Sequence, residues 1–234
     1  MTSTSGVYTA PYFISTLPLG RLGVYLMCRT FLNLLPRTPG VLQHHPPKFS
    51  PRLPARHRAS LSRVGFGLLN KVVLVYPSVW WDPTVIWWSL LPSSSKPTTD
   101  NPSPEEVLDR HTLSVQNYST LQDGAPVIVV FIGGSTAVML ERMSDAKVHD
   151  YFEKRIGRGI PLSDTHTTIA SPPSCVSCFA TRWLSEPYSR GSYAYLPPAA
   201  ENQEGASPLD MIELGRSLWD GRLGWAGEHT VENQ

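Results

Sequence analysis

The chain has 234 residues, of which 41% are hydrophobic and 17% charged, so it can bury a core and is not a disordered chain. Its net charge of +1 comes without a basic or acidic block, which argues against a dedicated nucleic-acid surface. The 22 prolines and 17 glycines exceed the roughly 12% that the two contribute to an average domain, so we expect long irregular segments.

Membrane and export signals are not evident in the sequence. No run reaches the roughly 18–20 apolar residues that a membrane span needs, and the closest, residues 17–35, is interrupted by Arg21 and Arg29. The N-terminus lacks the basic and then apolar regions of a secretory signal. Three cysteines, an odd and low number, fit a reducing compartment. We therefore expect an intracellular protein that has no membrane partner.

Two of the cysteines, Cys175 and Cys178, have the spacing of half a zinc site or of a redox pair. The chain has no second cysteine pair to complete a zinc site. The preceding Ser-Pro-Pro-Ser, residues 171–174, is typical of a loop. We therefore interpret the pair as structural and predict no bound metal.

The first half of the chain predicts short strands and one helix. Residues 12–19 favour a short buried strand, and residues 59–67 favour a helix that ends at a glycine. Residues 67–76 predict a buried strand, because residues 72–76 form a continuous β-branched and apolar run. Lys71 begins that run. A lysine at the head of a buried strand normally extends its ammonium to solvent.

The remaining elements follow in chain order. Residues 92–104 are rich in Ser, Pro and Thr and predict a disordered loop, and residues 157–179 predict a second irregular segment. Strands are predicted at residues 87–91, 127–132 and 222–226, and helices from residue 104 and at residues 136–143, 144–155 (with Ser144 as the cap) and 209–218.

Two stretches near the C-terminus carry the strongest functional pattern. Residues 181–196 are rich in aromatic side chains, among them Trp183 and Tyr193, and the tail strand stops at Gly227-Glu228. A strand that stops at Gly-Glu can bring its backbone close to a ligand and hold an acceptor beside it. Aromatic faces nearby can wall a flavin or an aliphatic amine. The competing interpretations are core packing for the rings and a solvated carboxylate for Glu228.

These stretches resemble a known family. Residues 182–193 read RWLSEPYSRGSY and residues 225–230 read WAGEHT. They are similar to the R-W-x-x-[DE]-P-[YFW]-x-R-G-[SA]-Y and F-A-G-E-H-T blocks of the flavin-containing amine oxidases, in the branch of the polyamine oxidases and lysine-specific histone demethylases. Residues 65–74, GFGLLNKVVL, resemble the family segment that carries a lysine.

The resemblance implies an α/β (α+β) fold with a partial FAD-binding domain and a mixed-sheet substrate domain, incomplete at both ends. The expected layout is a cofactor-domain remnant at residues 1–20, a substrate domain at 41–196 and a second remnant at 197–234. The family's glycine-rich βαβ unit and the segment after A-G-E-H-T have no match here, so the chain looks like a fragment. Residues 21–40 interrupt the family pattern, because without them STLPLG would run into VLQHHPP. We interpret them as a foreign insertion, such as a retained intron, with a true amphipathic helix as the alternative.

In this family a hydride passes from the carbon beside an amine nitrogen to the flavin N5, the imine is hydrolysed, and O2 reoxidises the flavin to give hydrogen peroxide. The resemblance assigns Lys71 to a water beside N5, Trp183 and Tyr193 to the walls of the amine pocket, and Trp183, Gly227 and Glu228 to FAD binding. A small polyamine is the favoured substrate, because no coiled-coil insertion like that of the histone demethylases is visible. The alternatives are a non-catalytic remnant or interaction module unable to bind FAD, and an unrelated binding protein with a Trp-rich surface.

Overall fold

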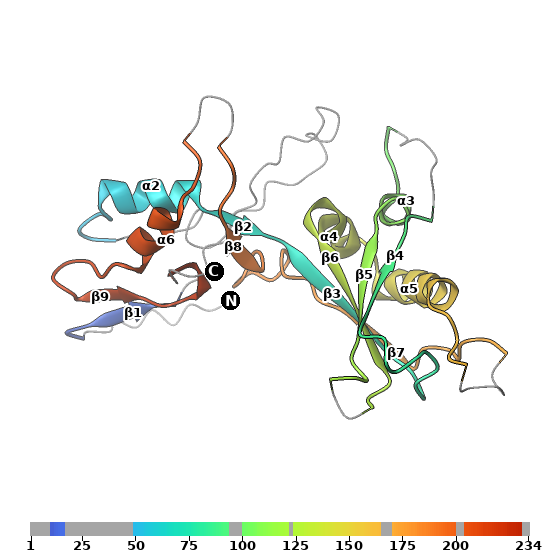
Figure 1. The fold of residues 1–234 in the computed structure, drawn as a ribbon. Coiled ribbons are helices and arrows are strands. Elements are labelled where there is room, and N and C mark those ends of the chain that lie inside the picture. The colour runs from blue at the N-terminus through green and yellow to red at the C-terminus, as the bar shows by residue number, and fades with distance from the viewer. Residues whose placement is uncertain are drawn as a thin grey trace, which may run out of the picture. The chain divides into compact units, whose positions relative to one another are not determined.

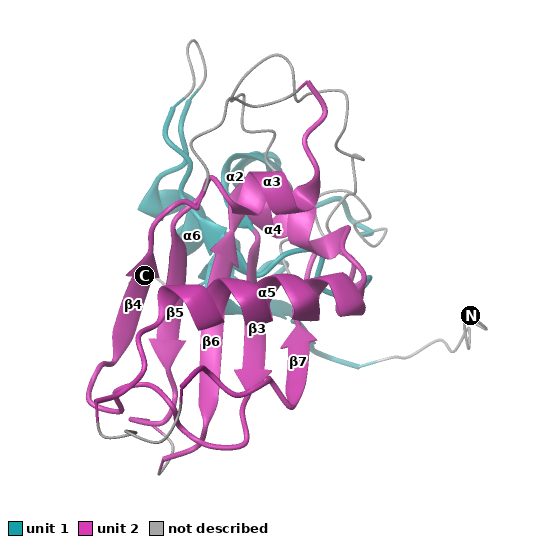
Figure 2. Ribbon diagram, turned by 90° about the vertical axis from the view of Figure 1, so that its right-hand side faces the viewer, with its two compact units in different colours: residues 1–24, 37–67, 187–234 teal, residues 25–36, 68–186 magenta. Residues whose placement is uncertain are grey.

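The computed structural model describes residues 10–16, 49–93, 100–121, 124–164, 170–199 and 204–230. It divides into two compact units, coloured separately in Figure 2. Unit 1 consists of residues 1–24, 37–67 and 187–234, and unit 2 of residues 25–36 and 68–186. None of the helices in the described residues is long and apolar enough to cross a bilayer.

Unit 2 is built on a five-stranded sheet in the order β4-β5-β6-β3-β7. Its strands are β3 (Leu69–Val75), β4 (Trp87–Leu90), β5 (Leu113–Asn117), β6 (Val127–Gly133) and β7 (Ser177–Ala180). Every pair among them is antiparallel. Because side chains alternate along a strand, Asn70, Val72 and Leu74 are buried on one face of β3, while Lys71 lies on the other face.

Helices bury that first face. Helix α5 (Asp145–Gly159) lies across the sheet in Figure 2 and buries Val148, Phe152 and Ile156 at helical spacing. Its N-cap is Ser144, whose hydroxyl accepts from the backbone N–H of Lys147 at 3.4 Å. Helix α3 (Pro104–Leu108) packs against α4 (Gly134–Glu141), which follows β6 directly.

An aromatic cluster follows the end of β3 in the chain. The rings of Tyr76, Trp80 and Trp81 meet edge to face with centroids 5.4–5.6 Å apart. Both tryptophans are completely buried. The indole N–H of Trp81 donates to Asn117 Oδ1 at 2.9 Å. Core packing therefore accounts for these two tryptophans, as expected for such residues.

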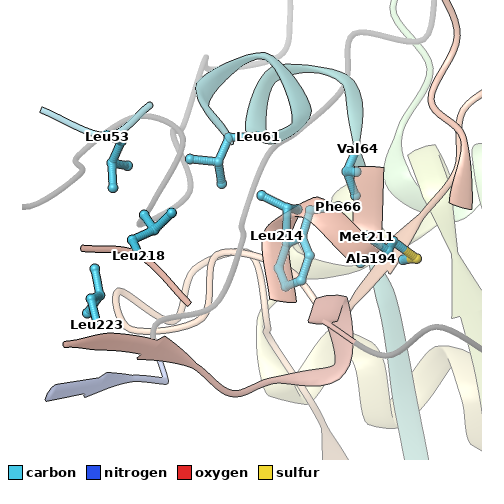
Figure 3. Packing of buried hydrophobic residues seen from close by; sticks show 9 residues of the cluster. All are labelled: Leu53, Leu61, Val64, Phe66, Ala194, Met211, Leu214, Leu218 and Leu223. Carbon is cyan, nitrogen blue, oxygen red and sulfur yellow. The ribbon is translucent and has the colours of Figure 1, made fainter. Parts of the chain in front are cut away.

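Unit 1 is assembled from three separate parts of the chain. Figure 1 labels six of its elements, which are β1 (Phe13–Ser15), α2 (Ala55–Arg63), β2 (Gly65–Gly67), β8 (Tyr193–Tyr195), α6 (Pro208–Gly215) and β9 (Leu223–Trp225). A 3₁₀ helix, η1 (Glu228–Thr230), follows β9. Strands β1 and β9 pair in parallel, and β2 and β8 pair antiparallel. Figure 3 shows its small core, in which Leu61 and Val64 near α2 lie with Phe66, Leu214 and Leu223.

A buried carboxylate joins the two helices of unit 1. Asp210 in α6 accepts from Ser60 Oγ at 2.7 Å and from Arg63 Nε at 3.1 Å, both in α2. The N–H of Ser207 donates to the other oxygen of Asp210 at 2.9 Å. Burial raises the pKa of Asp210, but the hydrogen bonds from Arg63, Ser207 and Ser60 outweigh it and hold the pKa below its ordinary value.

Most predicted elements appear within a few residues of their expected bounds. The predicted mixture of helices and sheets is confirmed, although the described strands of the large sheet are all antiparallel where a mixed sheet was expected. Two predictions were wrong. The segment 157–179 is not wholly irregular, because α5 continues to Gly159 and β7 begins at Ser177, and the helix expected at 59–67 ends at Arg63, because Gly65–Gly67 pairs as a strand.

The predicted insertion at residues 21–40 and the middle of the predicted loop, residues 94–99, lie outside the described residues, so both stay predictions. The predicted layout of cofactor and substrate domains also stays a prediction. The two units divide the chain after residues 67 and 186, rather than after residues 40 and 196.

Candidate functional site

Two of the predicted site residues, Lys71 and Trp183, belong to unit 2. Lys71 lies in β3, on the sheet face opposite α5, and its Nζ is 5.6 Å from the centre of the Phe131 ring on β6. That contact is within the range of a cation–π interaction. Phe131 in turn stacks on Trp87 with ring centres 5.4 Å apart. Lys71 is therefore a half-buried residue whose ammonium lies beside the Phe131 ring.

Trp183 is adjacent to Lys71 through its backbone. The N–H of Trp183 donates to Asn70 Oδ1 at 3.1 Å, and Lys71 exchanges two hydrogen bonds with Thr181. The Trp183 side chain is 40% exposed, so it is not a core residue of unit 2. The structure thus brings Lys71 and Trp183 to neighbouring positions within one unit.

The other predicted residues, Tyr193, Gly227 and Glu228, belong to unit 1. Glu228 Oε1 accepts from the backbone N–H of Ala194 at 2.9 Å, which puts this carboxylate next to Tyr193 in β8. Tyr193 is 52% exposed. Glu228 is therefore bonded to the protein's own backbone, and its interpretation as a merely solvated carboxylate is wrong.

Gly227 has a local reason to be glycine that the sequence did not suggest. A Cβ at this position would come within 2.8 Å of the ring of His229, which is buried. Close approach of a ligand is therefore not needed to explain it. Gly191 is likewise required by packing, since it has φ of 151° and a Cβ there would lie 2.3 Å from the Phe66 ring.

The cysteine pair is not activated. Cys175 Sγ lies 2.9 Å from the carbonyl oxygen of Ser177 and 3.3 Å from that of Val75. Burial raises the pKa of both thiols, that of Cys178 to about 12. A thiol that stays protonated near neutral pH is neither a good nucleophile nor a ready zinc ligand. No group of three or more candidate metal ligands occurs in the described part of the chain.

Comparison with known proteins identifies the family. The model of the flavin-containing amine oxidoreductases matches residues 3–234, so the chain belongs to that family. It is 30% identical to lysine-specific histone demethylase 1 homolog 2 of Arabidopsis thaliana, over 82% of this chain and 22% of that protein. It is 32% identical to lysine-specific histone demethylase 1 homolog 3 of Oryza sativa subsp. indica, over 82% of this chain and 21% of that protein.

The fold agrees with a solved member of the same class. Cyclohexylamine oxidase from Brevibacterium oxydans superposes with a TM-score of 0.52 at 16% identity, over 82% of this chain and 36% of that one. The likeness at this identity concerns the fold alone. The chain spans about a fifth of the length of the two plant relatives.

The family's cofactor is a flavin, FAD. Each unit contains groups of a kind that suits a flavin. Unit 2 has the Lys71 ammonium beside the Phe131 ring and the exposed Trp183, which are a hydrogen-bond donor and a flat apolar surface. Unit 1 has the Glu228 carboxylate, an acceptor held by the backbone N–H of Ala194.

Sequence reasoning missed two residues beside the site, Asn70 and Glu141. Asn70 was passed over because it lies between Leu69 and Lys71 in a strand that otherwise reads as apolar. A fully buried asparagine needs partners for its amide, and this requirement was the available signal.

Proposed function

We propose that this chain forms part of a flavin-dependent oxidase that breaks an amine C–N bond. The observation that carries the proposal is the family match over residues 3–234, which includes every residue assigned a role here. When bound, the flavin supplies the acceptor for the hydride that leaves the carbon beside the amine nitrogen. Oxygen then serves as the second substrate.

Each residue of this chain has a defined task in that proposal. The Lys71 ammonium donates hydrogen bonds and provides a positive field where negative charge develops. The Trp183 and Tyr193 rings exclude water from the amine and contact its aliphatic carbons. The Glu228 carboxylate, held by Ala194, accepts hydrogen bonds from hydroxyl groups of the cofactor, and the adjacent Gly227 adds no side chain there.

The proposal also specifies which amine is oxidised. A small polyamine is the substrate expected from the sequence. The second candidate is an N-methylated lysine side chain, and it is supported by the names of the plant relatives, which are lysine-specific histone demethylases. Both substrates present a secondary or tertiary amine with an aliphatic chain, and aromatic walls suit both.

The test begins with the purified chain. Addition of FAD is expected to give a bound flavin with quenched fluorescence and a visible absorbance band, and anaerobic addition of the correct amine is expected to bleach that band. Spermine and a peptide with dimethyl-lysine distinguish the two substrates. Failure of the chain to retain flavin would contradict the proposal and favour a non-catalytic remnant.

A lysine variant separates chemistry from binding. Lys71→Met is expected to lower the oxidation rate on the order of 100-fold, because it removes a charged donor from the reacting centre, while the affinity for FAD changes little. Lys154→Met is the control, since that ammonium pairs with Asp150 on the surface of α5. Equal rates for the two variants would exclude the assigned role. An intracellular location is part of the same proposal, and cell fractionation tests it.

A further inference from the structure

Asn70 is completely buried in β3, immediately before Lys71, and both the nitrogen and the oxygen of its amide are hydrogen-bonded. Its Nδ2 donates to Glu141 Oε1 at 2.8 Å. Its Oδ1 accepts from Thr181 Oγ1 and from the backbone N–H of Trp183, each at 3.1 Å. One side chain thus connects the lysine strand, the end of α4 and the segment that carries Trp183.

Glu141 holds the same segment from the other side. Its Oε1 accepts from the N–H of Leu184, and its Oε2 accepts from the N–H of Ser185, both at 2.9 Å. A carboxylate that accepts hydrogen bonds from successive backbone N–H groups holds that backbone in a fixed orientation. Residues 181–185 are therefore fixed by the Asn70–Glu141 pair.

Lys71 joins this arrangement through its backbone. Its N–H donates to Thr181 Oγ1 at 2.8 Å, and its carbonyl oxygen accepts from the N–H of Thr181 at 2.9 Å. The Thr181 hydroxyl hydrogen is directed to Asn70 Oδ1. The position of Trp183 relative to Lys71 consequently depends on the correct placement of the donor and the acceptor in the Asn70 amide.

We propose that Asn70 is a positioning residue for the amine-oxidation site, because its amide, oriented by Glu141, holds the Trp183 segment beside the strand that bears Lys71. This inference rests on the proposed function and adds a residue that touches neither substrate nor cofactor. It also explains why a polar side chain occupies a fully buried position in β3.

The donor requirement makes the proposal testable by a single-atom change. In Asn70→Asp the group facing Glu141 no longer donates, and two carboxyl groups face each other at hydrogen-bond distance. Such a pair ionises completely only when the pH rises well above the ordinary carboxyl range. The bond between positions 70 and 141 is therefore kept at low pH, where one proton is shared, and lost as the pH rises.

Other charged groups near the pair are accounted for. Arg182 donates to the carbonyl oxygen of Glu141 at 3.1 Å and pairs with Asp145 at the start of α5, and Lys71 lies on the opposite face of β3. All of them are present in both the wild-type chain and the variant. A pH response that appears only in the variant is thus assigned to the pair.

The chain has seven tryptophans, and the readout is its ¹⁹F spectrum after labelling with 5-fluorotryptophan. Loss of one signal in Trp183→Phe assigns the Trp183 resonance. The wild-type resonance is expected to stay constant between pH 5.5 and 8. In Asn70→Asp it is expected to match the wild type at pH 5.5 and to move by more than its linewidth by pH 8. A Trp183 resonance that does not respond to this substitution would overturn the proposal.

A matched control is present in the same unit. Asn117 is equally buried, and it accepts from the Trp81 indole N–H at 2.9 Å and from Ser119. Asn117→Asp is expected to move the Trp81 resonance and leave that of Trp183 unchanged. If Asn70→Asp displaces all seven signals, the milder variant Glu141→Gln is measured instead, because an amide cannot accept hydrogen bonds at both positions as the carboxylate does. Glu141→Gln is expected to displace the Trp183 resonance and leave the other six unchanged. Any other result would overturn the proposal.

The measurement needs no flavin, so it separates this inference from the proposed function. Wild-type chain that fails to bind FAD contradicts the proposed function whatever the ¹⁹F result. If FAD binds, the KM for the amine in Asn70→Asp is expected to rise with pH at least fivefold more than in the wild type, in parallel with the Trp183 shift. An unchanged KM together with a displaced Trp183 would overturn the positioning role.

Discussion

Different interactions stabilise the interior of each of the two units. In unit 2, residues 68–186 form strands of four to seven residues, and a continuous apolar core lies between the sheet and α5. In unit 1, the four described strands have three residues each, and they come from parts of the chain far apart in sequence. Long strands bury enough apolar surface to stabilise themselves, whereas three-residue strands do not.

Unit 1 supplements its small hydrophobic core with buried ionisable groups. The ion pair of Asp210 and Arg63 joins α2 to α6, and His57 is buried against the ring of Trp225 with centroids 4.9 Å apart. Buried ionisable groups make stability depend on pH. The comparison therefore predicts that unit 2 is sensitive to cavities and unit 1 to titration.

The largest effect is expected from a cavity in unit 2. Trp80→Ala removes a completely buried indole and is expected to lower the free energy of unfolding by about 4 kcal/mol, measured by urea denaturation. Trp87→Ala is the control, because that residue is 44% exposed and its ring stacks on Phe131, so about 1 kcal/mol is expected. Similar losses for both variants would mean that burial does not dominate in unit 2.

The next effect concerns the buried carboxylate of unit 1. Asp210→Asn weakens the bonds to Arg63 and Ser60 and is expected to cost about 2 kcal/mol. Because the pKa of Asp210 is lowered on folding, its contribution is present above the ordinary carboxyl range and is lost as the pH falls below about 4. Thermal melts from pH 7 to 3 should fall less steeply in the variant. Asp150→Asn, which changes a surface pair with Lys154, should behave like the wild type.

A smaller effect is expected from the buried histidines. Burial lowers the pKa of His57, and burial and the charge of His57 lower that of His229. Folding therefore favours the neutral rings, so stability is full above about pH 6.5 and declines as the pH falls through the folded-state pKa values. His57→Phe, which keeps a ring against Trp225, should reduce the loss of melting temperature between pH 6.5 and 5. An unchanged loss would show that His57 does not carry this titration.

The smallest effect compares one helix start in each unit. The Ser103 hydroxyl accepts from the N–H of Glu106 at 3.2 Å, while Glu106 accepts from the N–H of Ser103 at 2.7 Å. Ser103→Ala is expected to cost about 1 kcal/mol. Ser207→Ala in α6 is expected to cost only a few tenths of a kcal/mol, because its backbone N–H, not its hydroxyl, makes the close bond to Asp210. Urea denaturation midpoints measure both losses, and a larger loss in Ser207→Ala than in Ser103→Ala would contradict this comparison of the two caps.

The sequence predicted the parts of the fold that have a strong local pattern. The β-branched run at Val72–Val75, the run at Val127–Ile132 and the Ser144 cap each define an element without help from distant residues. Strands β2, β7 and β8 could not be found in this way. Their three or four residues carry no periodicity, and they exist because β3, or the partner strand in unit 1, supplies their hydrogen bonds.

Lys71, Trp183, Tyr193 and Glu228 were named from family patterns, and their roles stay predictions. The structure adds the contacts that hold Lys71, Trp183 and Glu228 in place, which the sequence did not indicate. The Asn70–Glu141 pair joins residues that are 71 positions apart in the sequence, and no local sequence pattern indicates such a contact. Gly227 was explained by ligand approach, whereas the neighbouring His229 ring already requires it.

The pairing of β1 with β9 sets an order in time. A ribosome adding about 5–20 residues per second needs roughly 10–40 s to travel from residue 15 to residue 225. Phe13–Ser15 therefore leaves the ribosome well before its partner β9, and residues 68–186 follow between the two as one continuous segment. The antiparallel sheet of unit 2 is consequently complete in the nascent chain before β9 becomes available to pair with β1.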